Sequence, residues 1–348
     1  MLKLNDREWK EFAFSDLFIV QRGESLYKQY MERGTIPYVS ASSANNGVSD
    51  YTKTANRTGN MLSLAYDGSV GSTFYQSSAW FASEKIVSIE LRDRVFSREL
   101  ALFFARVIEH QKTKYNYGYK WSVGIRMMRG KIRIPITPKG KPDYDFMETY
   151  IKEREAIKRQ EYLTYCNAQL KKIRETSTPF ELNAVIWKEF FIKDIFSSIQ
   201  RGKRLTRDNQ TKGDTPYVSS SAINNGVDNF ISNNSGVRKF KSCLSLANSG
   251  SVGSCFYEPF EFVASDHITH LKKDELTSYH YLFIATMLNR LSEKYNFNRE
   301  INDSRISREK VMLPVDKKGE INYTFMEQYA KNAVFKKCLS YIEYCEKL

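Results

Sequence analysis

The 348-residue sequence contains no long apolar run. Its hydrophobic stretches are short and interrupted by charged residues, so none approaches the roughly 20 residues that a membrane-spanning helix needs. The first residues, MLKLNDREWKEF, contain no apolar core of the kind that secretory signals carry. We therefore expect a cytoplasmic protein that does not associate with membranes.

Cysteine and histidine are scarce. The five cysteines form no Cys-x-x-Cys pair and their number is odd, which favours a reduced protein over a disulfide scaffold. Among the four histidines, His267 and His270 lie close together beside Asp266, but no further matched ligand accompanies them. We expect no metal site.

Motifs of familiar catalytic centres are also missing. The sequence has no Gly-x-Ser-x-Gly elbow, no glycine-rich strand for S-adenosylmethionine and no Asn-Pro-Pro-Tyr loop. Glu8-Trp9-Lys10 has the Glu-x-Lys spacing of some nucleases, but no preceding strand carries the aspartate that such a centre requires. These absences favour a binding protein without a catalytic centre or cofactor of its own. A nuclease with an unrecognised centre is the alternative.

Positive charge is abundant. There are 53 Lys and Arg residues against 40 Asp and Glu residues, which gives a formal net charge of +13. This balance favours a polyanionic partner, because neutralised phosphates release their counterions. Double-stranded DNA is the partner we expect, and a merely basic soluble protein is the alternative.

The chain contains two copies of one unit, offset by about 179 residues. Trp9-Lys10-Glu11-Phe12 returns at 187–190, Gln21-Arg22-Gly23 at 200–202, and Gly68-Ser69-Val70-Gly71 at 250–253. Two similar domains in tandem suit a two-part target, because protein symmetry mirrors site symmetry. We predict recognition domains at 1–145 and 179–324, a central helical spacer at 146–178 and a C-terminal helix at 325–348.

Each repeat predicts an α+β domain. In the first repeat, β-branched and aromatic residues predict strands at 36–40, 61–65, 72–75, 85–91 and 131–135, and an amphipathic pattern predicts a helix over 99–114. Residues 9–18 have mixed periodicity and predict a strand or a short helix. Asn45-Asn46-Gly47 indicates a tight turn. Gly68-Ser69-Val70-Gly71 lacks the Lys-Ser/Thr of a phosphate-binding loop and predicts a hairpin turn.

Two charged helical segments predict a coiled coil. Apolar residues recur at helical spacing from Asp145 to about Thr176, and again from Thr324 to the end of the chain. The predicted seam consists of Ala156, Leu163, Cys166, Leu170 and Ile173 in one helix and Val334, Cys338, Tyr341, Cys345 and Leu348 in the other. We expect the two helices to pack antiparallel and to relate the domains by a pseudo-twofold axis.

Residues 111–142 form the most basic stretch. They contain nine Lys and Arg residues, no acidic residue and interleaved aromatics. Such residues can hold phosphates, read guanine edges or pack on bases, so we expect DNA contact here; a solvated basic face over core aromatics is the alternative. The shared Gln-Arg-Gly, followed by Lys28 in one repeat and by Lys203 and Arg204 in the other, is either a phosphate anchor or a turn that the fold needs.

Base readout is expected where the repeats diverge inside the shared frame. The first divergent pair is Tyr66-Asp67 against Asn248-Ser249, and the second is 117–121 against 297–301. Arg suits guanine, Asn suits adenine, and Asp can accept from cytosine. The candidate DNA-binding residues are Arg22, Lys28, Tyr66, Asp67, Tyr117, Tyr119, Lys120, Trp121 and Arg126, and in the second repeat Arg201, Lys203, Arg204, Asn248, Ser249, Asn298, Arg299 and Arg305.

The order of these motifs resembles the specificity subunits of type I restriction–modification systems. Trp-Lys-x-Phe opens each repeat, Gly-Ser-Val-Gly follows, and a strand like Lys131–Pro135 leads into a helix. The segment 139–144 before Phe146-Met147-Glu148 looks closer to the type IIB branch.

The resemblance covers nearly the whole chain. It implies two target-recognition domains, an interrupted DNA target, and helices that dock partner subunits. The implied partners are an adenine methyltransferase, which binds S-adenosylmethionine, or fused restriction and modification subunits. A tandem-domain DNA-binding regulator without methyltransferase partners is the alternative.

Overall fold

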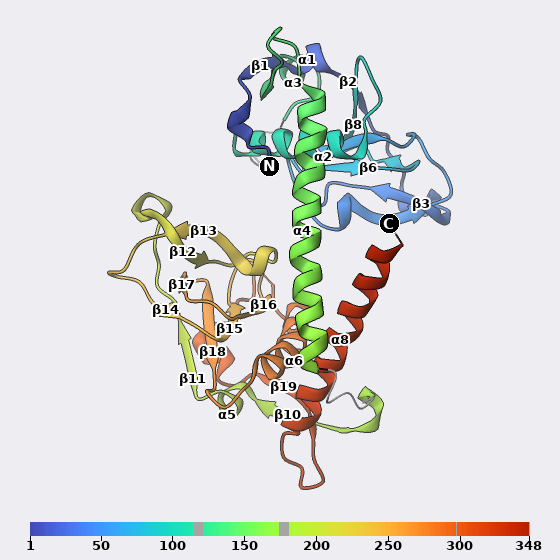
Figure 1. Ribbon diagram of the computed structural model, residues 1–348. Coiled ribbons are helices and arrows are strands. Elements are labelled where there is room, and N and C mark those ends of the chain that lie inside the picture. Colours follow the sequence, from blue (N-terminus) through green and yellow to red (C-terminus); the bar gives the residue numbers. More distant parts are fainter. Residues whose placement is uncertain (115–120, 174–180, 297, 348) are drawn as a thin grey trace. The chain divides into compact units, whose positions relative to one another are not determined.

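A computed structural model describes residues 1–114, 121–173, 181–296 and 298–347 (Figure 1). The chain forms two compact units, unit 1 from Met1 to Tyr162 and unit 2 from Leu163 to Leu348. The domain boundaries predicted from the sequence stay a prediction.

Unit 1 is built on two sheets and one two-stranded ladder. The main sheet has the strand order β2-β8-β5-β6, the smaller sheet has the order β4-β3-β7, and β1 pairs with β9. Its elements are η1 (Leu4–Asp6), β1 (Trp9–Ala13), α1 (Phe14–Leu17), β2 (Phe18–Arg22), η2 (Lys28–Tyr30), β3 (Arg33–Val39), η3 (Asn45–Gly47), β4 (Val48–Thr52), β5 (Met61–Ala65), β6 (Thr73–Gln76), β7 (Phe81–Ala82), β8 (Ile86–Leu91), α2 (Arg98–Glu109), η4 (His110–Lys114), α3 (Ile125–Arg129), β9 (Lys131–Pro135) and the start of α4 (Tyr144–Ile173).

The core of unit 1 lies between the main sheet and α2. Every side chain of β5 is buried, and Leu62 pairs with Ile89 across the antiparallel β5–β8 ladder. The helix α2 begins at a cap in which the hydroxyl of Ser97 accepts from the backbone N–H of Leu100, and its apolar face buries Phe104 completely. Apolar residues at helical spacing thus face a sheet whose central strand β5 is covered on both faces.

Unit 2 repeats this topology. Its sheets have the orders β11-β18-β15-β16 and β13-β12-β17-β14, and β10 pairs with β19. Its elements after the end of α4 are η5 (Leu182–Ala184), β10 (Ile186–Phe191), α5 (Ile192–Ile195), β11 (Ser198–Arg201), η6 (Arg207–Asn209), β12 (Lys212–Val218), η7 (Asn224–Gly226), β13 (Val227–Ile231), β14 (Lys239–Phe240), β15 (Cys243–Ala247), β16 (Cys255–Glu258), β17 (Phe262–Ala264), β18 (Ile268–Lys272), α6 (Ser278–Leu288), η8 (Asn289–Glu293), α7 (Asp303–Ile306), β19 (Lys310–Val315) and α8 (Tyr323–Glu346).

The tryptophan that opens each repeat has the same role in both units. The indole N–H of Trp9 donates to the carbonyl of Leu4 at 2.7 Å, and Trp187 donates to Leu182 at 3.0 Å. The Trp9 ring stacks on Phe103 with centroids 6.2 Å apart, and Trp187 stacks on Phe283 at the same distance. The shared Trp-Lys-x-Phe therefore fixes the β1 and β10 strands against the helices α2 and α6.

In unit 2 the end of α4 packs antiparallel against α8. The thiols of Cys166 and Cys338 hydrogen-bond to each other, and both are buried. Further along α4, Lys172 lies over the ring of Tyr279, which Lys331 of α8 also approaches. Later residues of α4 thus contact earlier residues of α8, as in an antiparallel helix pair. Leu170 also packs in this seam.

The predicted seam is longer than the observed one. Ala156 is exposed and Leu163 is half-buried, so the buried seam between α4 and α8 begins at Cys166. Leu348, which we also assigned to the seam, and the predicted end of the helix near Thr176 lie outside the described residues. The α+β class, the tandem domains and the long helix between them are confirmed, and the pseudo-twofold axis stays a prediction.

Candidate nucleic-acid interface

The shared glycine turn is held between two other segments of unit 1. Residues 68–71 join β5 to β6, and Gly68 and Gly71 have φ of 78° and 86°. A Cβ atom on Gly68 would lie 2.9 Å from Cβ of Ala41, and one on Gly71 would lie 2.4 Å from Cβ of Lys112. Glycine is thus required both for backbone conformation and for close approach. The hairpin prediction is confirmed.

Unit 2 builds the same cluster. A Cβ atom on Gly250 would lie 2.3 Å from the hydroxyl of Ser220, and one on Gly253 would lie 2.5 Å from the backbone nitrogen of Ser292. The backbone N–H of Ser251 donates to the carbonyl of Ser220 at 3.2 Å. In each unit a serine-containing loop, the glycine turn and the segment after the main helix therefore form one loop cluster.

The Asn-Asn-Gly turn lies beside this cluster. Asn45 and Asn46 adopt φ of 49° and 56°, as asparagine tolerates, and Gly47 adopts 77°. The Asn46 side chain donates to the carbonyl of Tyr75 at 2.9 Å, which ties the turn to β6. The tight turn predicted from the sequence is confirmed.

The glycine of Gln-Arg-Gly is required by the fold. A Cβ atom on Gly23 would lie 2.1 Å from the carbonyl oxygen of Ser83, and one on Gly202 would lie 2.1 Å from that of Ser265. No side chain fits between backbones that approach so closely. This part of the motif therefore serves the turn, which is one of the two interpretations that the sequence left open.

The arginine of the motif reaches Tyr66 of the first divergent pair and Val123, which lies just before α3. Arg22 is exposed and donates to the carbonyl of Val123 at 3.1 Å, while its guanidinium lies 5.8 Å from the centre of the Tyr66 ring. The Tyr66 hydroxyl donates to the carbonyl of Glu84 at 2.5 Å. Tyr66 and Asp67 are half-buried. The structure thus brings Arg22 together with Tyr66 and with the segment that contains Arg126.

The corresponding corner of unit 2 turns its divergent pair inward. Asn248 and Ser249 are each 2% exposed. The side-chain NH2 of Asn248 donates to the Thr269 hydroxyl at 3.1 Å, its backbone carbonyl accepts from the backbone N–H of Ile301 at 2.9 Å, and Ser249 hydrogen-bonds to His267. Both residues are therefore buried and not exposed as the DNA-facing prediction requires: the Asn248 NH2 and the Ser249 hydroxyl are hydrogen-bonded within unit 2, and Asn248 Oδ1 is buried with no hydrogen-bond partner in the described parts of the chain.

Trp121 also differs from its prediction. Its ring is 1% exposed and packs edge-on against Phe14 with centroids 5.5 Å apart. A large indole stabilises the fold most when it is removed from water. The core interpretation of this aromatic therefore replaces the DNA-facing one. Its counterpart Ile301 is equally buried. Tyr117, Tyr119 and Lys120 lie outside the described residues, and their DNA contact stays a prediction.

The other basic candidates lie on the surface. Lys28, Arg126, Lys203 and Arg204 are exposed, whereas Arg201 is half-buried and donates to the carbonyl of Asp266 at 2.5 Å.

The second-repeat candidates after η8 are exposed as well. Arg299 lies 5.2 Å from the centre of the Tyr295 ring, Arg305 donates to the carbonyl of Glu300 at 2.5 Å, and the backbone N–H of Asn298 donates to Asn296. Their contact with DNA stays a prediction.

A buried acid anchors the segment that carries them. Lys294 Nζ contacts the two carboxylate oxygens of Glu309 at 2.8 and 2.9 Å, and the Tyr295 hydroxyl donates to the same carboxylate. Burial raises the pKa of Glu309, but these hydrogen bonds outweigh it and hold the pKa below its ordinary value. Gly130 holds the corresponding place in unit 1, since Phe14 and Ile192 donate to the carbonyls of Gly130 and Glu309, respectively.

Two arginines that we did not predict donate hydrogen bonds to the backbone of the Gln-Arg-Gly motif, one in each unit. Arg57 donates to the carbonyl of Arg22 and, at 2.9 Å, to the hydroxyl of Ser88, and Arg238 donates to the carbonyl of Arg201. Neither arginine lies in a motif that the two repeats share. The only signal in the sequence is a single arginine at a matching offset in each repeat.

Among residues 1–114, 121–173, 181–296 and 298–347, no cluster of three or more His, Cys, Asp or Glu residues could hold a metal ion. Within the same ranges, no helix combines the length and the apolar character needed to cross a bilayer. His270, one of the two histidines considered above, hydrogen-bonds to Ser198 and to the carbonyl of Gln200, and burial lowers its pKa.

Two relatives of known kind are similar to this chain. A specificity subunit of a type II restriction enzyme from Heyndrickxia coagulans is 35% identical over 154 residues, which span 44% of this chain and 45% of that protein. A protein named as a type I specificity subunit from Mycoplasma pneumoniae is 22% identical over 323 residues, or 89% of this chain and 86% of that protein.

The match to a crystal structure of a type I restriction–modification S subunit from M. genitalium covers 99% of this chain and 94% of that chain, with 15% identity and a TM-score of 0.41. The family described as type I restriction modification DNA specificity domain matches residues 6–164 and again 185–343. With nearly all of both repeats matched, the chain belongs to the type I restriction–modification DNA specificity family.

Proposed function

We propose that this chain reads an interrupted DNA sequence, one half with each unit, and directs adenine methylation and restriction by partner subunits in the cytoplasm. In this proposal the chain has no catalytic centre, and S-adenosylmethionine binds to the methyltransferase partner. The observation that carries it is a duplicated frame on which the exposed basic residues differ between the copies. A duplicated reader with two different surfaces suits two different half-sites.

In this proposal the residues that the two repeats share serve folding, and exposed residues that differ between the repeats serve base readout. Shared residues such as Gly23, Gly68 and Trp9 are used in close backbone approach or core packing in both units. Exposed residues near these turns include Arg126 in unit 1 and Arg299 and Arg305 in unit 2. Bases that differ between half-sites need different side chains, so we assign base readout to the exposed segments and not to the buried pair Asn248-Ser249.

The partners would dock on the helices. Tyr162 and Tyr165 of α4 are 42% and 47% exposed, and Tyr344 of α8 is 58% exposed. Exposed aromatics on helices are typical of protein interfaces, where Tyr is enriched. We assign these residues to a methyltransferase or to a fused restriction and modification subunit, of a type I or a type IIB system.

The test is to map methylated adenines by sequencing DNA from a host that carries the complex with Arg299→Ala/Arg305→Ala or with Arg126→Ala. The unit 2 variant should relax one half-site and the unit 1 variant the other, because each lost base contact costs about 1–3 kcal/mol of discrimination. Lys317→Ala, which removes an exposed cation from the turn between β19 and α8, is the control for loss of charge.

An unchanged methylated sequence in a complex that assembles with both arginine variants would rule out the assignment to these arginines. Loss of adenine methylation from every motif when the chain is deleted, and its return when the chain is restored, is the expected result for the wider proposal. Methylation that persists without the chain would overturn it.

A further inference from the structure

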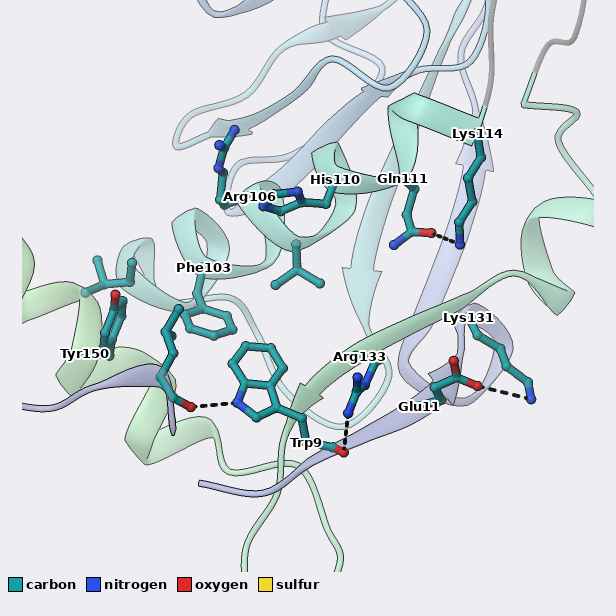
Figure 2. A pocket seen from close by; sticks show the side chains of 13 residues that line it. Trp9, Glu11, Phe103, Arg106, His110, Gln111, Lys114, Lys131, Arg133 and Tyr150 are labelled. Carbon is teal, nitrogen blue, oxygen red and sulfur yellow. Dashed lines mark hydrogen bonds and ion pairs between the residues drawn. The ribbon is translucent and has the colours of Figure 1, made fainter. Parts of the chain in front are cut away.

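Unit 1 contains a cavity of about 600 Å³ between α2, α4 and the β1–β9 ladder (Figure 2). Its floor is formed mainly by Trp9, Phe103, Val107 and Tyr150. The Phe103 ring lies 6.2 Å from both the Trp9 and the Tyr150 rings. Since the Trp9 indole N–H already donates to Leu4, the floor offers mainly apolar surface, which fits an aliphatic or aromatic side chain.

Four cationic side chains surround this floor: Arg106, Lys114, Lys131 and Arg133. Glu11 is the one acidic residue in the lining, and it lies 3.6 Å from Lys131. Lys114 donates to the neutral amide of Gln111 at 2.7 Å, and Arg133 reaches the carbonyl of Trp9 at 3.4 Å. Arg106 lies 3.4 Å from the carboxylate of Glu109, one turn along α2, in a pair that is exposed on the arginine side. The rim therefore carries excess positive charge above an apolar floor.

The shared fold does not require this charge. Arg133 pairs with Glu11 in the β1–β9 register, and Met312 pairs with Glu189 at the same place in unit 2. Thr286 occupies the position on α6 that Arg106 occupies on α2, three residues after the stacked phenylalanine.

A third difference concerns the lysine after the helix, whereas Lys131 has a counterpart in Lys310. Lys294 corresponds to Lys114, but its ammonium group is bound to the buried Glu309. The cationic rim is therefore a property of unit 1, which indicates a role that unit 2 lacks.

We propose that this cavity binds a segment of a protein partner in which an apolar side chain is flanked by acidic residues. The apolar side chain would cover Trp9 and Phe103, and its neighbouring carboxylates would pair with Arg106 and Arg133. Arginine is suited to carboxylates because its guanidinium presents a planar fork of donors. A nucleotide fits less well, since a base edge needs polar partners that this floor does not supply.

The experiment measures fluorescence anisotropy of the full chain with a fluorescein-labelled peptide, acetyl-Asp-Glu-Leu-Phe-Glu-Asp-amide. Arg106→Thr/Arg133→Met introduces the unit 2 residues at exposed positions, so the fold should be retained, which the melting temperature checks. Arg290→Thr/Lys310→Met removes the same charge from unit 2 and is the matched control. A peptide with Ala-Ala in place of Leu-Phe tests the apolar floor, and labelled single-stranded oligothymidine tests nucleic acid.

We expect the peptide dissociation constant to rise about fivefold in Arg106→Thr/Arg133→Met and to change by less than about twofold in the control. The Ala-Ala peptide should bind the unaltered chain no better than the double variant binds the original peptide. Equal peptide binding by both variants and the unaltered chain would overturn the proposal. Loss of oligothymidine binding alone in Arg106→Thr/Arg133→Met would also overturn it, and would assign the cavity to nucleic acid.

Discussion

Gln76 in unit 1 and Glu258 in unit 2 occupy the same place in their sheets, but the hydrogen-bonding groups of the Gln76 side chain are better paired than those of Glu258. Gln76 pairs with Met61 and Glu258 with Cys243 at the ends of matching ladders. The Gln76 amide donates to Ser63 and to the carbonyl of Asn46, both at 3.0 Å. Glu258 accepts from Ser245 at 2.8 Å, but its other carboxylate oxygen has no hydrogen-bond partner in the described parts of the chain.

This difference shows that two units with the same topology can differ in how well their buried polar groups are hydrogen-bonded. Burial raises the pKa of Glu258 to about 7, so the carboxylate is costly at neutral pH. The amide in unit 1 carries no such charge and has both a donor and an acceptor. The duplicated sequence therefore predicts one topology for the two units, but their stability and its pH dependence are set by individual buried side chains.

The largest expected effect tests the matched buried pair Trp121 and Ile301. Trp121→Ala should destabilise unit 1 by about 4 kcal/mol, and Ile301→Ala should destabilise unit 2 by about 3 kcal/mol, because each leaves a cavity in a packed core. Guanidinium chloride denaturation followed by circular dichroism measures both. If Trp121→Ala kept full stability but weakened DNA binding, the ring would be a DNA contact and its assignment to the core would be wrong.

The second prediction tests Glu258 directly. Its folded pKa of about 7 lies above the ordinary value of 4.5, so its contribution to stability is fully present below pH 4.5 and is lost as the pH rises through about 7. At about 1.36 kcal/mol for each pH unit, the loss approaches about 3 kcal/mol above neutral pH.

Glu258→Gln should remove this slope and stabilise unit 2 at pH 8, and Gln76→Glu should introduce the slope into unit 1. Melting temperatures recorded from pH 5 to pH 8 give the comparison. An unchanged slope in Glu258→Gln would show that other groups cause it.

The smallest of the three effects is a difference in the free energy of unfolding between alanine substitutions at two glycines that the fold needs for different reasons. Gly23→Ala places a Cβ atom 2.1 Å from a backbone oxygen, whereas Gly140 has φ of 72° with nothing within 4 Å. Gly140→Ala should cost about 1 kcal/mol through backbone strain. Gly23→Ala should cost about 2 kcal/mol more through overpacking. Urea titrations measure both, and equal costs would contradict the close approach.

Local pattern predicted most elements of the fold. The predicted strand at 61–65 is β5 and that at 131–135 is β9, because short apolar runs bounded by turn signals are typical of strands. The mixed segment 9–18 contains a strand and then a single helical turn. The burial of Asn248, Ser249 and Trp121 was not predicted, because a polar or aromatic residue in a loop segment has no local signature of facing inward.

By itself the sequence determined the duplication, the turns and the apolar periodicity, because these depend on backbone preference and on neighbours along the chain. Only the tertiary structure decided which side chains of the loop clusters face inward. Asn248 is buried because Thr269 and Ile301, both distant in sequence, offer it hydrogen bonds. Arg133 lies on a cavity rim because its strand pairs with β1. Long-range pairing creates both environments, and no local pattern carries that information.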